Sequence, residues 1–167
     1  MDLLRAYHSL THNSKLIIHL LFVGDGALRP ELENYAKQHN LNGVHFAGFK
    51  NQTELPCYYA IADIFVLPSG AGETWGLAVN EAMCFSLPIV VSSMVGCGPD
   101  LVKEGINGYI FPMGNIKRLT LYLKDLTGDK EKRKLFGHKS GELIQAYSYE
   151  KDIKGMLQAF ALSSPHR

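Results

Sequence analysis

Cysteine is scarce in this sequence, with three residues among 167, namely Cys57, Cys84 and Cys97. Three widely spaced cysteines do not make a disulfide framework or a zinc site, and they predict small buried thiols in the reducing cytoplasm. An excess of charge of one sign is lacking too, because seventeen Lys and Arg residues balance sixteen Asp and Glu residues. With no basic block in the chain, we expect no nucleic-acid partner.

Long apolar runs and metal-binding clusters are also missing. The longest apolar run, Leu16 to Val23, is interrupted by His19 and is far shorter than the roughly 20 residues that cross a bilayer. One suggestive histidine pair, His8 and His12, has no cysteine or acid beside it to complete a ligand set, so no metal is expected. The 46% of hydrophobic residues nevertheless predicts a packed core, and the length predicts one domain, 1–167.

The stretch from Ala62 to Met83 joins a strand pattern to a helix pattern. Its apolar run closes at Pro68 and predicts a buried parallel strand. A glycine-rich loop follows, in which Thr74 is placed to cap a helix that begins at about Trp75. Ligands of open α/β sheets dock at such crossovers, and the free N–H groups of a helix start favour a phosphate. The stretch therefore predicts an anion site.

Two carboxylates flank this helix start. Glu73 lies in the loop, and Glu81 follows eight positions later, which is roughly 12 Å along a helix. One acid could accept hydrogen bonds from hexose hydroxyls and the other from ribose hydroxyls, with the phosphates of a sugar nucleotide between them. On spacing alone, two solvated acids near a helix start are the commoner arrangement.

The residues between the two acids carry a resemblance. Glu73 and Glu81 enclose Trp75-Gly76-Leu77 and are followed by Ala82-Met83. This resembles the donor-site motif of glycosyltransferase family 4, usually E-G-F-G-L-x-x-x-E-A-M, with Thr74 in place of the first Gly and Trp75 in place of Phe. The resemblance implies that Glu73 contacts the donor sugar in the catalytic site and that Glu81 contacts the ribose. It also implies that sugar and diphosphate meet the backbone at Thr74, Trp75, Gly76 and Leu77.

The resemblance extends to the fold and the reaction. It implies an α/β fold, a Rossmann-like three-layer domain with a mostly parallel sheet, which is the C-terminal, donor-binding half of a GT-B fold. A retaining enzyme of this family transfers a sugar from a nucleotide-diphosphate sugar to a glycan or lipid-linked acceptor, with no cofactor or metal. The acceptor would bind through an N-terminal domain, toward which the final helix, about 148–163, packs. Peripheral membrane association of the full enzyme would fit such acceptors.

The N-terminal part of the chain agrees with this family only in places. We expect a buried strand from Lys15 to Val23, closed by Gly24-Asp25-Gly26. Arg29 stands where a dinucleotide fingerprint has its third glycine, so an NAD site is not expected. The family shows V-G-D-G here, which implies base or phosphate contacts near Gly24 and Gly26 and, after the next strand, near Phe49 and Lys50. The strand and the Arg/Lys loop that precede the first helix in the family have no counterpart.

Three functions remain open on the sequence. The first is the donor-binding domain of a retaining glycosyltransferase. The second is a binding-only or truncated module that grips a nucleotide sugar without turnover. The third is a GT-B sugar-nucleotide epimerase, against which the motif and its flanks argue.

Overall fold

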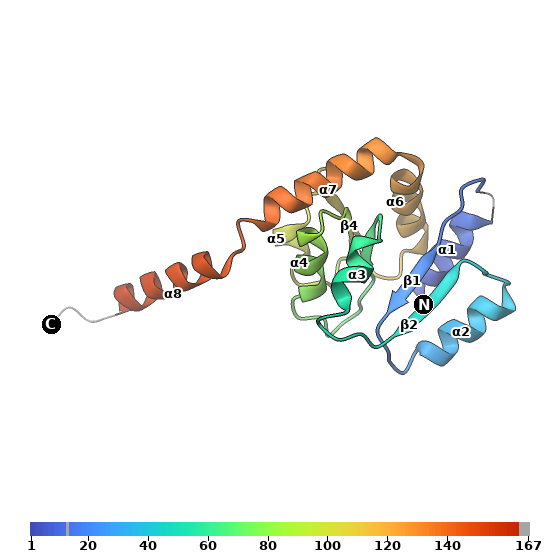
Figure 1. The fold of residues 1–167 in the computed structure, drawn as a ribbon, viewed down its shortest axis with the longest axis horizontal. Coiled ribbons are helices and arrows are strands. Elements are labelled where there is room, and N and C mark those ends of the chain that lie inside the picture. The colour runs from blue at the N-terminus through green and yellow to red at the C-terminus, as the bar shows by residue number, and fades with distance from the viewer. Residues whose placement is uncertain (13, 164–167) are drawn as a thin grey trace.

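The computed structural model describes residues 1–12 and 14–163, so residues 13 and 164–167 of the predicted domain lie outside it. Helices and strands alternate along the described chain (Figure 1). The strands are β1 (Leu20–Val23), β2 (Val44–Gly48), β3 (Phe65–Leu67), β4 (Ile89–Ser92) and β5 (Gly108–Phe111). The helices are α1 (Asp2–Thr11), α2 (Arg29–Gln38), α3 (Leu55–Ala60), α4 (Leu77–Cys84), α5 (Gly98–Leu101), α6 (Ile116–Gly128), α7 (Lys130–Ile144) and α8 (Tyr149–Ser163).

Every strand pair among the described residues is parallel, which confirms the predicted α/β fold. The strands form two hydrogen-bonded groups, β1–β2 and β3–β4–β5. In the second group Val66 of β3 lies opposite Val90 of β4, which lies opposite Tyr109 of β5. Because parallel strands end at the same edge, the loops after β3, β4 and β5 leave the sheet together.

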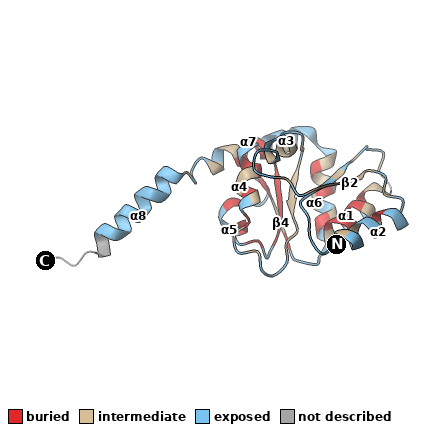
Figure 2. Cartoon of the chain, turned by 60° about the horizontal axis from the view of Figure 1, so that its bottom comes forward, coloured by how far each residue is buried: buried red, intermediate tan, exposed pale blue. Residues whose placement is uncertain are grey.

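The central strand β4 shows the three layers. Its residues are all buried and alternate between two cores. Ile89 and Val91 pack with Met83 of α4, whereas Val90 packs with Leu119 of α6 in a core that α1 also contributes to. Figure 2 shows the buried residues gathered in the body of the molecule around β4. The predicted arrangement, with a sheet between two layers of helices, is therefore present.

The predicted buried strand from Lys15 to Val23 is wrong in length and burial. Only Leu20–Val23 is a strand, and Ile17 is 89% exposed. Leu21 and Val23 are exposed as well, because in the described chain β1 is hydrogen-bonded to β2 alone and one face of this pair is open. Two of the cysteines also depart from the prediction: Cys97 is buried, but Cys57 and Cys84 are exposed.

Helix α8 extends away from the body of the molecule (Figures 1 and 2). None of its residues from 149 to 161 is buried. The expectation that this helix packs toward an N-terminal domain stays a prediction. Within the described part of the chain, no helix is both long enough and apolar enough to span a membrane.

Candidate functional site

The predicted site lies where the chain passes from β3 into α4. The helix begins at Leu77, two residues later than predicted, and its N-cap is Gly76 with a left-handed backbone (φ 95°). Thr74 therefore does not cap the helix, and no side chain makes a cap hydrogen bond there. The reason is that the backbone turns at Gly76, directly before the first helical residue, which is a conformation that favours glycine.

The loop between β4 and α5 lies directly against this turn. A Cβ added at Gly96 would collide with the backbone carbonyl of Thr74, so the two loops touch backbone to backbone. The Cys97 N–H donates to the Trp75 carbonyl at 2.8 Å. Burial raises the pKa of the Cys97 thiol to about 11, so near neutral pH it is a protonated packing group and not a nucleophile. The loops after β3 and β4 thus pack directly against each other.

Glu73 is half-buried in the β3–α4 loop. The hydroxyl of Ser69, at the start of that loop, lies 3.4 Å from Glu73 Oε2 and donates to it. Ser92, the last residue of β4, is fully buried and donates its own hydroxyl to the carbonyl of Ser69. The position of Glu73 is therefore tied to the carboxyl end of β4 through two hydroxyl groups.

Glu81 is half-buried on α4, in the helix that begins directly after the turn at Gly76. The hydroxyl of Tyr59, on α3, donates to Glu81 Oε2 at 2.7 Å. Burial, and then the hydrogen bond and the negative charge of Glu81, raise the pKa of Tyr59, so the phenol keeps its proton across the neutral range. Glu81 consequently has one of its two carboxylate oxygens fixed by a neutral donor.

The indole of Trp75 is hydrogen-bonded to α4. Its Nε1–H donates to Oδ1 of Asn80 at 2.9 Å. Neither Asn80 nor Tyr59 was singled out from the sequence as a site residue. Tyr59 lies in a largely apolar and aromatic stretch of sequence, and the one signal there is a hydroxyl group at a position that a Phe would fill equally well.

The other predicted contacts lie at the ends of β1 and β2. Gly24 N–H donates to the carbonyl of Gly48 at 2.8 Å, and Gly26 has open space around its Cα. Phe49 is 76% exposed, and Lys50 pairs with Glu54 at 3.5 Å. No hydrogen bond among the described residues joins Gly24, Gly26, Phe49 or Lys50 to the loop that carries Glu73. Their roles as base or phosphate contacts remain predictions.

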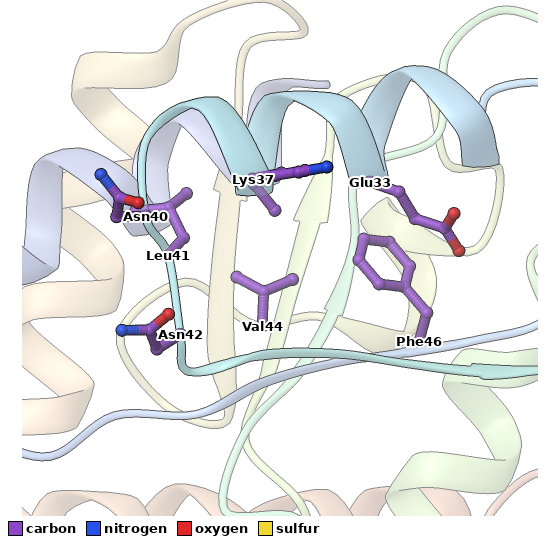
Figure 3. Close-up of a pocket in the computed structure, with 8 residues that line it drawn as sticks. Glu33, Lys37, Asn40, Leu41, Asn42, Val44 and Phe46 are labelled. Atoms are coloured by element: carbon purple, nitrogen blue, oxygen red, sulfur yellow. The ribbon is translucent and has the colours of Figure 1, made fainter.

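A separate hollow of about 420 Å³ lies between α2 and β2. Figure 3 shows Val44 and Phe46 rising from the strand toward the helix, with Glu33 and Lys37 on the helix side. None of the motif residues lines it. Among the described residues, no set of three or more His, Cys, Asp or Glu side chains is placed to hold a metal ion.

A sequence model of one family, the glycosyl transferases group 1, matches residues 1–142 of this chain. The chain belongs to that family. A glycosyltransferase of Methanocaldococcus jannaschii is 28% identical over 158 residues, which are 95% of this chain and 43% of that protein. The chain spans less than half the length of the first curated relatives it matches.

Solved structures of GT-B glycosyltransferases share the fold. The sucrose-phosphate synthase of Thermosynechococcus elongatus superposes with a TM-score of 0.83 at 26% identity, over 96% of this chain and 41% of that one. HepE of Anabaena, solved in complex with UDP and glucose, superposes with a TM-score of 0.81 at 22% identity, over 98% of this chain and 44% of that one. The described residues therefore form an α/β domain of the GT-B type.

Proposed function

We propose that this chain is the donor-binding domain of a retaining, family 4 glycosyltransferase that takes its sugar from a nucleotide-diphosphate sugar. The observation that carries the proposal is the pair of packed loops at the carboxyl ends of β3 and β4. There the turn at Gly76 starts a helix, and both Glu73 and Glu81 are held by hydroxyl groups at its two sides. The complex of HepE, a protein of the same fold, with UDP and glucose supports a nucleotide sugar as the ligand.

The diphosphate of the donor would lie against the backbone at Trp75 to Leu77. The N–H groups and the positive end of α4 favour a negative charge there by about 0.3–1 kcal/mol each at an exposed site. Glu73 would accept hydrogen bonds from the donor sugar, and Glu81 from the ribose. Each such charge-assisted bond contributes about 1.5–3 kcal/mol.

In the reaction, the bond between the anomeric carbon and the diphosphate oxygen breaks as the acceptor hydroxyl attacks from the same face. The acceptor proton passes to the departing diphosphate, whose growing charge the helix start stabilises. The chemistry needs no cofactor or metal in this proposal. The acceptor, a glycan or a lipid-linked glycan, would bind through an N-terminal domain, and a lipid-linked acceptor would bring the full enzyme to a membrane surface on the cytoplasmic side.

Calorimetry with two carboxylate variants tests the proposal. Glu81→Gln should weaken the binding of a nucleoside diphosphate and of its sugar conjugate alike, by about 1.5–3 kcal/mol, because the ribose is common to both ligands. Glu73→Gln should weaken the binding of the sugar-bearing donor and leave the binding of the bare nucleoside diphosphate unchanged. Equal losses for the two ligands in Glu73→Gln would contradict the assignment of that acid to the sugar.

Incubation with a donor labelled in its sugar separates the alternatives. Sugar transferred to an acceptor indicates the transferase, and an altered sugar on an intact donor indicates an epimerase. Tight donor binding with no product indicates a binding-only module.

A further inference from the structure

Tyr59 reaches the proposed donor site from a helix that carries none of the motif. It lies on α3, 22 positions before Glu81, and its hydroxyl donates to Glu81 Oε2 at 2.7 Å. Among the described residues this is the one hydrogen bond made by the side chain of Glu81. The orientation of that carboxylate therefore depends on Tyr59.

The ring of Tyr59 is fixed before any ligand arrives. It stacks on Phe85, which follows α4, with the ring centroids 5.5 Å apart, and it packs against Phe65 of β3 at 6.0 Å. The side chain also packs against the buried core of α4 and β4. A rigid phenol at this distance fixes one carboxylate oxygen and leaves Oε1 of Glu81 without a protein partner in the described chain.

We propose that Tyr59 is a positioning residue that presents Glu81 to the ribose hydroxyls of the nucleotide and so sets a preference for ribonucleotides. The inference rests on the proposed function, in which Glu81 meets the ribose. Oε1 accepts from a ribose hydroxyl while Oε2 is held by the phenol. Because Tyr59 stays protonated, it cannot repel the carboxylate and donates throughout the neutral pH range.

The test is Tyr59→Phe, which keeps the stacked ring and removes only the hydroxyl. The probes are UDP, with GDP and ADP as alternative bases, and the 2′,3′-dideoxy form of whichever binds. Calorimetry should show about a threefold to tenfold loss of affinity for the ribonucleotide, as expected for one net hydrogen bond. The dideoxy form, which has no ribose hydroxyls for Glu81 to meet, should bind Tyr59→Phe and the unaltered chain equally.

Tyr109→Phe is the matched control. Tyr109 also donates its hydroxyl to a half-buried carboxylate, Asp125 Oδ2, at 2.6 Å, on the far side of the sheet. This variant loses the same chemistry away from the proposed site, so its affinity for both nucleotides should be unchanged. Any general effect of removing a tyrosine–carboxylate bond appears in both variants.

The outcomes separate this inference from the function it rests on. If Glu81→Gln weakens the ribonucleotide and Tyr59→Phe does not, the role of Tyr59 is refuted and the donor site stands. If Tyr59→Phe weakens the ribonucleotide and its dideoxy form equally, Tyr59 is structural and the inference is again refuted. If Glu81→Gln has no effect on any of the three nucleotides, both proposals fall.

Discussion

Among single residues outside the proposed site, His8 of α1 lies in a cluster of histidine and tyrosine rings. Its Nδ1 lies 3.2 Å from the hydroxyl of Tyr35, and its ring centroid lies 4.6 Å from that of His39, the residue that follows α2. His12 is one helical turn away, with its ring 6.2 Å from that of His8. Burial lowers the pKa of His8, and positive charge on His39 and His12 lowers it further.

Stability should therefore depend on pH through His8. Its pKa in the folded chain lies below the ordinary value of 6.5, so the unfolded chain takes up the proton more readily. The contribution of His8 to the free energy of unfolding is complete above pH 6.5. It is lost as the pH falls through the lower pKa of the folded state. The free energy of unfolding, measured with urea between pH 7.5 and about 5, should change less with pH in His8→Gln than in the unaltered chain. An identical slope in both proteins would show that His8 does not contribute.

Some site residues could be proposed from the sequence, whereas others depend on packing that it does not encode locally. The resemblance to a donor-site motif assigns Glu73 and Glu81 to one site, which their spacing alone does not, and their roles stay predictions. The bond between Tyr59 and Glu81 could not be predicted, because it requires α3 and α4 to lie side by side across 22 positions of chain. Thr74 was misassigned because capping preferences favour Thr, whereas the close loop contact and the left-handed turn place Gly76 at the cap.

Among the elements, the loop from Val95 to Cys97 supports the turn of the motif. Gly76 has no Cβ to meet the side chain of Val95, and Gly96 has none to meet the carbonyl of Thr74. This explains why a loop outside the motif carries a glycine that the site requires. Two adjacent strand ends are joined through contacts that only small residues allow.

Gly96→Ala should disrupt this contact. The added methyl group would collide with backbone, which cannot move aside as a flexible side chain could. We expect the free energy of unfolding to fall by about 1–3 kcal/mol, the usual cost of overpacking. Nucleotide affinity should fall with it, because the turn at Trp75 and Gly76 is displaced.

Gly128→Ala is the control for this change. Gly128 ends α6, and an added Cβ there meets nothing within 4 Å. Its stability and nucleotide affinity should match those of the unaltered chain. A Gly96→Ala protein as stable as this control would show that the two loops are not in firm contact.

Elements were predicted best where the apolar pattern was continuous. The apolar residues after Pro88 form the buried strand β4, Ile89–Ser92, which has neighbouring strands on both edges and cores on both faces. The run Lys15 to Val23 is also largely apolar, although His19 interrupts it, but it is only partly a strand. Apolar residues such as Ile17 predict burial, yet the described chain supplies no neighbour to cover it.

At the scale of the whole molecule, the chain is one three-layer body with a projecting helix (Figure 1). The body contains both cores and both loops of the proposed site, whereas α8 has no buried residue from 149 to 161. Its exposed apolar residues include Ile153 and Leu157, one helical turn apart. The prediction that this helix packs toward an N-terminal domain is consistent with that exposure and stays a prediction.

In our proposal, a nucleoside diphosphate binds at one edge of the body, where the loops after β3 and β4 meet. That edge is distinct from the hollow between α2 and β2 (Figure 3). The two regions contain different backbone amides. A ligand that binds in one region changes the chemical shifts of the amides there and leaves those of the other region unchanged.

Mapping the backbone amide shifts of the chain on addition of UDP, GDP or ADP tests the central claim most directly. The account predicts that at least one of these nucleotides produces its largest shifts at Trp75, Gly76, Leu77 and Cys97. Largest shifts at Val44 and Phe46, or no shift at the turn with any of the three, would contradict it.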